Sequence, residues 1–136
     1  MYPVRTTVEQ QTASVPVTPP EKPQTFLFFE DGSKRTLSVP SSLILGRKPA
    51  PQQTGDIALA VPDHTGTVSR NHARIELVDD QIWITDLAST NGTRVLDESG
   101  EETELEPNVR TRMHVGSRIG LGDMGCSIIT SKSRRR

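Results

Sequence analysis

The chain has 136 residues, enough for one domain with a hydrophobic core and too few for two ordinary domains. Its net charge is −1, so the balance of the whole chain argues against bulk nucleic-acid binding. No run approaches the roughly 20 apolar residues of a membrane span, and the N-terminus lacks the apolar core of a signal peptide. The one cysteine, Cys126, cannot form an internal disulfide, so we expect a reducing, cytoplasmic compartment.

The two ends of the chain differ in composition from its middle. Residues 1–24 hold five prolines and one aromatic residue, a composition that cannot bury enough apolar surface to offset the entropy of ordering. We therefore expect a disordered Pro/Thr-rich linker over residues 1–24. Residues 131–136 carry four positive charges and no negative ones, so we expect a basic tail there.

The middle of the chain, residues 25–130, is predicted to be one domain built of short strands. Asp31-Gly32 and Asp79-Asp80 are turn signals between apolar runs, and residues 73–77 alternate apolar and polar side chains as a half-buried strand does. No helical period extends over 11 residues. About eleven strands are expected, at residues 25–29, 35–39, 42–45, 56–61, 73–77, 81–85, 93–96, 102–105, 113–115, 118–121 and 126–130. The predicted fold class is all-β, an antiparallel β-sandwich.

Three polar segments lie where these strands end or begin. Residues 46–47 end one strand, residues 69–72 precede another, and residues 89–93 follow a third. In a β-sandwich the strands hold the fold, and the loops at one end are free to bind. If these loops lie at the same end, their side chains converge.

The side chains in these segments suit a phosphate group attached to a peptide. Arg47 presents a planar fork of donors that stays charged, Arg70 adds a second guanidinium, and Ser69 adds a hydroxyl donor. Charge-assisted hydrogen bonds to phosphate are roughly twice as strong as neutral ones. Asn91 can donate and accept through its amide, as holding a peptide backbone requires. The set indicates binding without bond-breaking chemistry.

The order of these segments closely resembles the forkhead-associated (FHA) domain, over roughly residues 26–130. Members of that family fold as an eleven-stranded β-sandwich of the SMAD/FHA-like type and bind phosphothreonine peptides through apical loops. The resemblance implies that Arg47 and Ser69 contact the phosphate and that Asn91 holds the peptide backbone. It implies five binding residues in all, which are Arg47, Ser69, Arg70, Thr90 and Asn91. The loop-bracing residues would be Gly46, His72 and Gly92.

One departure from the family pattern is a long loop over residues 48–67, rich in Pro and Gly. It could lie beside the pocket and alter which peptide side chains are read. The resemblance also implies that the residue three places beyond the phosphothreonine sets partner choice.

The sequence thus predicts a phosphothreonine-dependent binding module of bacterial Ser/Thr kinase signalling. Its expected partners are a phosphorylated protein or peptide and a Ser/Thr protein kinase, with no enzymatic activity, cofactor, metal or nucleic acid. Thr6 and Thr7, after Arg5, are candidate phosphorylation sites. The 18 residues from Thr7 to Thr25 would extend to about 60 Å, so the phosphorylated tail could reach the domain's own pocket.

Several alternatives stay open from the sequence. Ser69 and His72 could form the nucleophile–base pair of a hydrolase. The domain could instead be a structural β-sandwich that assembles proteins without phosphate, and the tail threonines could be plain linker residues. The chain could also be the cytoplasmic part of a longer, membrane-attached protein.

Overall fold

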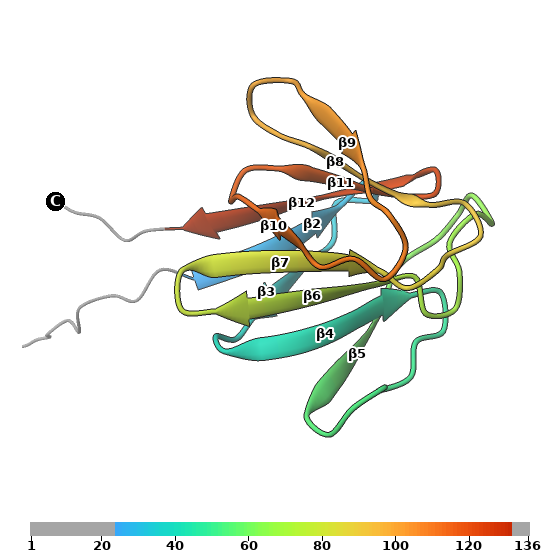
Figure 1. Ribbon diagram of the computed structural model, residues 1–136, viewed down its shortest axis with the longest axis horizontal. Helices are drawn as coiled ribbons and strands as arrows, with labels where there is room; N and C mark the ends of the chain where they lie inside the picture. Colours follow the sequence, from blue (N-terminus) through green and yellow to red (C-terminus); the bar gives the residue numbers. More distant parts are fainter. Residues whose placement is uncertain (1–23, 132–136) are drawn as a thin grey trace, which may run out of the picture.

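A computed structural model describes residues 24–131, so the predictions for residues 1–23 and 132–136, including Thr6 and Thr7, lie outside it. Eleven strands in the described part form two sheets packed face to face (Figure 1). The predicted all-β sandwich is confirmed. Within residues 24–131 there is no helix long and apolar enough to cross a membrane. The strands are β2 (Gln24–Phe29), β3 (Lys34–Leu37), β4 (Ser41–Gly46), β5 (Asp56–Ala60), β6 (Ala73–Val78), β7 (Gln81–Asp86), β8 (Thr93–Leu96), β9 (Glu102–Glu104), β10 (Thr111–Met113), β11 (Arg118–Leu121) and β12 (Met124–Ser131).

The two sheets have the strand orders β10-β7-β6-β4-β5 and β3-β2-β12-β11-β8-β9. Neighbouring strands pair antiparallel, as expected, except β4 and β5, which run parallel from Ser42↔Asp56 to Gly46↔Ala60. For this pair the antiparallel expectation was wrong, because residues 47–55 carry the chain back to the start of β4 before β5 begins. The long loop expected at residues 48–67 is thus divided by a strand.

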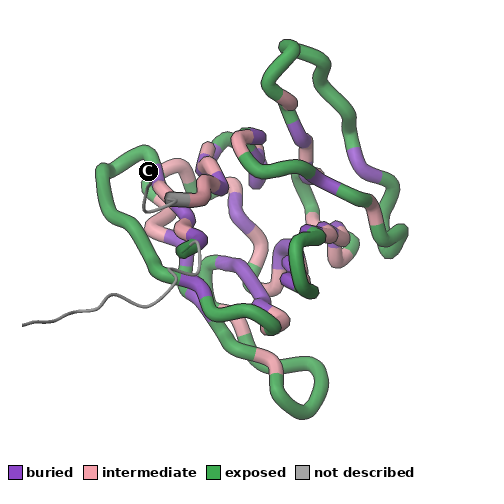
Figure 2. The backbone as a smooth tube through the Cα atoms, turned by 90° about the vertical axis from the view of Figure 1, so that its left-hand side faces the viewer, coloured by how far each residue is buried: buried purple, intermediate pink, exposed green. Residues whose placement is uncertain are grey.

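The core lies between the sheets and follows from the alternation of side chains along each strand. Leu27 and Ile128 of the six-stranded sheet and Ile75 and Ile84 of the five-stranded sheet are all 0% exposed. Figure 2 shows that the protruding loops are mostly exposed. Cys126 belongs to this core, where burial raises the pKa of its thiol to about 12.

The topology gathers three loops at one end of the sandwich. Strands β4, β5 and β7 end there and β6 begins there, so the loops over residues 61–72 and 87–92 lie at the right-hand end in Figure 1. The loop over residues 47–55 starts at the same end and then runs back toward the beginning of β4. Gln24 and Ser131, which pair with each other, lie at the opposite end. The site loops and the two ends of the described chain are therefore separated by the length of the sandwich.

Candidate functional site

The three polar segments predicted to converge are joined directly by hydrogen bonds. The backbone N–H of Arg47 donates to the carbonyl of Ser69 at 2.9 Å. The backbone N–H of Thr90 donates to Ser69 Oγ at 3.0 Å, and Asn91 Nδ2 donates to the carbonyl of Thr67 at 2.9 Å. The loop around Ser69 is thus fixed on one side to the end of β4 and on the other to the loop after β7.

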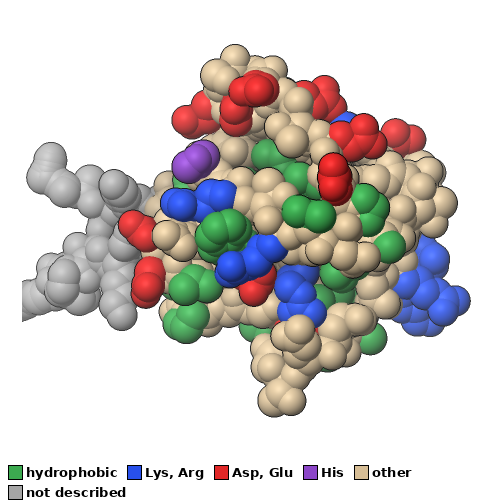
Figure 3. Space-filling view, viewed as in Figure 1, with side chains coloured by type: hydrophobic (Ala, Val, Ile, Leu, Met, Phe, Trp, Pro, Cys, Tyr) green, Lys and Arg blue, Asp and Glu red, His purple; other side chains and the backbone are tan. Residues whose placement is uncertain are grey.

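These bonds leave the Ser69 hydroxyl and both arginines with free donors. Because Ser69 Oγ accepts from Thr90, its own proton remains available to a ligand. Arg47 Nε donates to the carbonyl of Val68 at 3.3 Å, which holds the guanidinium beside Ser69 and leaves its terminal nitrogens unused by that contact. Arg47 and Arg70 are exposed, and neither forms an ion pair with any residue from 24 to 131. Figure 3 shows basic side chains gathered at this right-hand end.

Thr90 and Asn91 lie beside this group on the exposed surface of the next loop. Asn91 uses one of its two amide N–H donors on Thr67 and keeps the other and its carbonyl oxygen. A bound peptide backbone can therefore still be gripped by this side chain.

Gly46 is required by a close backbone approach. A Cβ placed on Gly46 would lie 1.8 Å from the carbonyl oxygen of Arg70. The end of β4 therefore packs against the backbone of residues 69–70 with no room for a side chain. Gly92 has φ of +84°, which favours glycine, and its carbonyl oxygen is turned toward the interior, where it accepts from Gly122 N–H and contacts His72.

His72 is fully buried and ties two of the loops together. Its Nδ1 accepts the backbone N–H of Ser69 at 3.0 Å, so the proton of the neutral ring is on Nε2, which donates to the carbonyl of Gly92 at 2.8 Å. Burial lowers the pKa of His72 below its usual 6.5. Since neither ring nitrogen bonds to Ser69 Oγ, the ring is not placed as a base for that hydroxyl, and the hydrolase alternative has no supporting geometry.

Asp86 braces the loop after β7, although the sequence did not single it out as a site residue. Its carboxylate accepts from Ser89 Oγ and Thr93 Oγ1, each at 2.6 Å, and from Ser89 N–H at 3.2 Å. Asp86 is 1% exposed. The alternation of Ile82 and Ile84 along β7 was a usable signal, because it places Asp86 on the inward face, where a carboxylate needs hydrogen-bond donors.

Asp63 shapes the loop that leads to Ser69. Its carboxylate accepts the backbone N–H groups of Thr65, Gly66 and Val68 and the hydroxyl of Thr65. Although burial opposes it, these bonds lower the pKa of Asp63 to about 2. Asp63 therefore organises the turn over residues 63–68, and its carboxylate is occupied by these donors.

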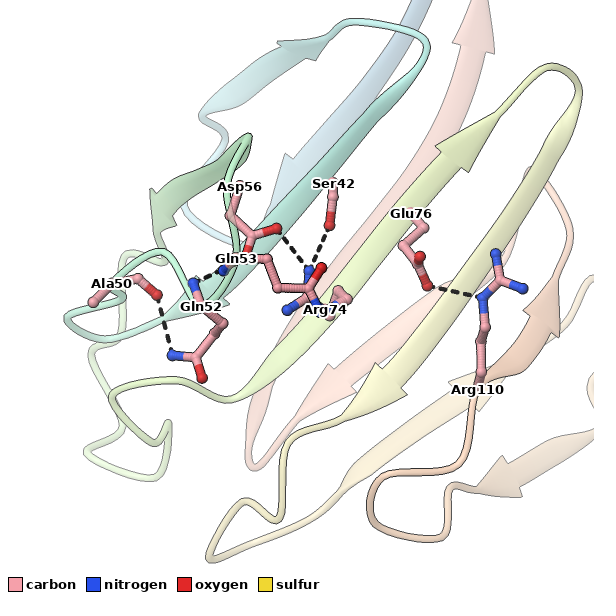
Figure 4. A network of polar contacts seen from close by, with 8 residues as sticks. All are labelled: Ser42, Ala50, Gln52, Gln53, Asp56, Arg74, Glu76 and Arg110. Atoms are coloured by element: carbon pink, nitrogen blue, oxygen red, sulfur yellow. Dashed lines mark hydrogen bonds and ion pairs between the residues drawn. The ribbon is translucent and has the colours of Figure 1, made fainter.

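The loop over residues 47–55 is fixed by a separate set of contacts on the outer face of the five-stranded sheet (Figure 4). Asp56 accepts the backbone N–H groups of Gln52 and Gln53, each at 2.8 Å, and pairs with Arg74 Nη1 at 2.7 Å. The same Arg74 nitrogen donates to Ser42 Oγ at 2.7 Å. Burial raises the pKa of Asp56, but these bonds outweigh it and lower the pKa to about 2.

This group, which we call the Asp56 clasp, is nearly closed to solvent. The side chain of Asp56 is 1% exposed and that of Arg74 is 11% exposed. One further bond joins the loop to the site, from Ala50 N–H to Asn71 Oδ1 at 2.9 Å. The loop thus has a defined place beside residues 69–72.

The fold and these loops define a β-sandwich with a cationic, hydrogen-bonding apex. A model of the FHA domain family matches residues 43–122, which include every predicted site residue outside the tail. The chain belongs to the FHA domain family.

Three solved FHA domains are similar in structure. The FHA domain of the CT664 protein from Chlamydia trachomatis has a TM-score of 0.60 and 24% identity, over 78% of this chain and 96% of that one. One FHA domain solved for its phosphothreonine-dependent interactions has a TM-score of 0.54 and 28% identity, over 78% of this chain and 95% of that one. The FhaA FHA domain, in complex with the intracellular domain of Rv3910, has a TM-score of 0.52 and 30% identity, over 76% of this chain and 98% of that one.

Curated relatives match over a shorter stretch. Chloroplastic zeaxanthin epoxidase of Solanum lycopersicum is 42% identical over 55 residues, which are 40% of this chain and 8% of that protein. The corresponding protein of Oryza sativa is 32% identical over 82 residues. This chain spans about a tenth of the length of these curated relatives.

Proposed function

We propose that the apical loops bind a phosphothreonine-containing segment of a partner protein. The observation that carries the proposal is the free donor set at the apex: the Ser69 hydroxyl proton and the guanidinium groups of Arg47 and Arg70. A phosphate carries about −1.5 to −2 charges at pH 7 and three acceptor oxygens, so two arginines and a hydroxyl match it in charge and in donors. Thr90 and Asn91 lie next to this set, where the peptide on either side of the phosphate would run.

The similar structures support the same reading. One of them was solved for phosphothreonine-dependent FHA interactions, and another, the human APLF FHA domain, in complex with a bisphosphorylated peptide. The proposed function is recognition alone, and it places the protein downstream of a Ser/Thr kinase whose product it binds.

The test is calorimetric titration of the chain with one peptide in its phosphothreonine, phosphoserine and unphosphorylated forms. We expect clear binding of the phosphothreonine form only. Arg47→Ala should weaken it at least tenfold, because it removes the guanidinium beside Ser69. Arg112→Ala, an exposed arginine on β10, is the matched control and should bind normally. Equal affinity for all three peptides, or full binding by Arg47→Ala, would contradict the proposal.

A finer proposal concerns the chain's own tail. Thr6 or Thr7, once phosphorylated, would occupy the apex and block partner binding. The described chain begins at the end opposite the apex, so the tail must run the length of a strand of about six residues, roughly 20 Å. From Thr7 to Gln24 the chain advances by 17 residues, which extend to about 56 Å, so the tail is long enough.

NMR spectra of the kinase-treated chain test this finer proposal. Phosphorylation should shift the amide signals of Arg47, Ser69 and Thr90. The double substitution of Thr6 and Thr7 by Ala should abolish the shift, whereas substitution of Thr12 by Ala should not. Unmoved loop signals in a chain that still binds a phosphothreonine peptide would exclude self-binding and leave partner binding intact.

A further inference from the structure

The four edge strands of the sandwich differ in charge. β3 carries Lys34 and Arg35, β9 carries two glutamates, and β10 carries Arg112. From residue 57 to 60, β5 reads Ile-Ala-Leu-Ala and has no charge. Proteins usually protect edge strands with charged side chains, because an unpaired edge is a template for another strand. By this criterion β5 is the one unprotected edge in the described residues.

The backbone of β5 offers a defined set of hydrogen-bonding groups. The N–H of Val61 donates to the carbonyl of Gly46 on β4. Because backbone groups alternate in direction along a strand, those of Ile57 and Leu59 also point toward β4, and those of Ala58 and Ala60 point away from it. No described strand lies on that side. The edge therefore presents two donors and two acceptors in a row.

Beneath this edge lies a groove with apolar side chains at its floor and polar ones, among them Arg35, Thr36 and Ser38, at its rim. It has a volume of about 410 Å³ and separates β5 from β3, the neighbouring edge of the other sheet. Leu37, Leu43 and Leu59 line its floor, and Ile57, which is 46% exposed, lines its side. A strand added to β5 would place alternate side chains over this groove, where an apolar side chain would be buried.

The rim of the groove is basic. Arg35 lines it, is exposed, and forms no ion pair with any residue between 24 and 131. Arg35 is paired with Leu27 across β2 and β3. Because paired residues lie on the same face of a sheet and Leu27 faces the core, Arg35 also points to the side of the sheet on which the groove lies. An acidic side chain in the added strand would gain a charge partner there.

We propose that β5 is a strand-addition site for an extended segment of a partner protein. The segment pairs with Ala58 and Ala60, places an apolar side chain over the groove and an acidic one beside Arg35. A second copy of this chain fits less well. Antiparallel pairing of two β5 strands would keep both six-stranded sheets on one side, so the basic β3 strands of the two copies would face each other. This site is independent of the phosphate site, since it uses none of the apical side chains.

The test uses two capped peptides and the isotope-labelled full chain. The acidic probe is Asp-Val-Thr-Val-Thr-Val-Asp, and the basic probe has Lys in place of each Asp. We expect the acidic probe to shift the amide signals of Ala58 and Ala60 and to bind at least fivefold more tightly than the basic probe. Arg35→Glu, a change at an exposed position, should reverse that preference.

A second pair of variants isolates the backbone contact. Ala58→Pro removes an edge N–H without removing a bond to β4, and should weaken binding of the acidic probe at least tenfold. Ala58→Gly keeps the N–H and should bind like the parent chain. If Ala58→Pro lowers the melting temperature sharply, its loss of binding could come from unfolding, and the change of peptide preference in Arg35→Glu then serves as the test of the proposed site. Unmoved Ala58 and Ala60 signals, equal binding of both probes, or shifts that depend on protein concentration without peptide would each overturn the proposal, the last in favour of self-association.

Discussion

The loops at the apex are held in two different ways. The loops over residues 61–72 and 87–92 are anchored from inside the sandwich, by His72 and Asp86, which are 0% and 1% exposed. The loop over residues 47–55 is anchored from outside, by the Asp56 clasp on the outer face of the five-stranded sheet. The first pair of loops therefore depends on the core, and the third depends on the Asp56 clasp together with the bond from Ala50 N–H to Asn71 Oδ1.

This difference separates two tasks that one surface has to perform. Ser69 and Thr90 belong to the loops anchored from inside, and the backbone of Arg47 is bonded to Ser69. The residues proposed to contact the phosphate are thus held in place by the same buried side chains that stabilise the fold. In the described part of the chain, residues 48–55 reach this group through two bonds, from Lys48 N–H to the Arg70 carbonyl and from Ala50 N–H to Asn71 Oδ1. The rest of the segment lies outside these contacts, which suits a segment that reads the side chains flanking a phosphothreonine.

Asp86→Ala should have the largest effect of the changes that test this comparison. It would leave the Ser89 and Thr93 hydroxyls without their buried acceptor, and each such group costs about 1–3 kcal/mol. We expect urea unfolding to show a loss of about 3 kcal/mol, together with loss of phosphothreonine-peptide binding. Asp80→Ala, at an exposed turn, is the control. Full stability in Asp86→Ala would show that the interior does not hold these loops.

Asp56→Ala should have a smaller effect on stability and a different effect on binding. Breaking a fully buried ion pair typically costs about 3–5 kcal/mol, and we expect about 2 here because Arg74 stays 11% exposed. The affinity for the phosphate should persist while the preference for flanking peptide residues changes. A peptide library screened against both proteins measures this.

Glu102→Ala is the matched control for Asp56→Ala. It breaks the pair between Arg94 and Glu102, whose side chains are 37% and 56% exposed, and should cost less than about 1 kcal/mol. The contribution of Asp56 should also depend on pH. Its pKa of about 2 lies below the unfolded value of 3.8, so its stabilisation is complete above about pH 5 and is lost as the pH falls toward 2. Equal costs for the two variants would remove the distinction between the loops.

The sequence was sufficient to predict the strands and to place the three polar segments at strand ends, whereas their meeting at one end of the sandwich was only a condition of the argument. Alternating side chains and turn residues mark strands locally, and loops that connect neighbouring strands must lie at the ends of a sandwich. The parallel pairing of β4 and β5 was not predictable in this way, because alternation defines which face a side chain occupies and not the direction of the neighbouring strand.

The roles of Asp56, Asp63 and Asp86 were also missed. Each resembles an ordinary turn or strand-end carboxylate in sequence, since its donors are backbone N–H groups or side chains that only the fold brings near. Arg47, Ser69 and Asn91 were selected as candidates from their hydrogen-bonding groups and from the FHA resemblance. The residues that position them have no such pattern, so they became visible only with the geometry.

The smallest expected effect concerns His72, which holds two loops from inside the sandwich, and is measured through its protonation. The folded pKa of His72 is lowered by burial, so the unfolded chain takes up the proton first, below its ordinary pKa of about 6.5. Stability from this residue is therefore complete above that pH and falls as the pH drops below it. A proton on Nδ1 would also break its bond to the Ser69 N–H, so phosphopeptide affinity should fall at a lower pH, where the folded ring itself takes up the proton. In unfolding and binding measured from pH 7.5 to 5, stability should begin to fall near pH 6.5 and binding should weaken only at a lower pH, and His72→Asn should remove this pH dependence at the cost of a lower affinity throughout. If binding weakens below pH 6.5 in His72→Asn as it does in the parent chain, the change belongs to the phosphate, whose second pKa is about 6, and His72 does not titrate over this range.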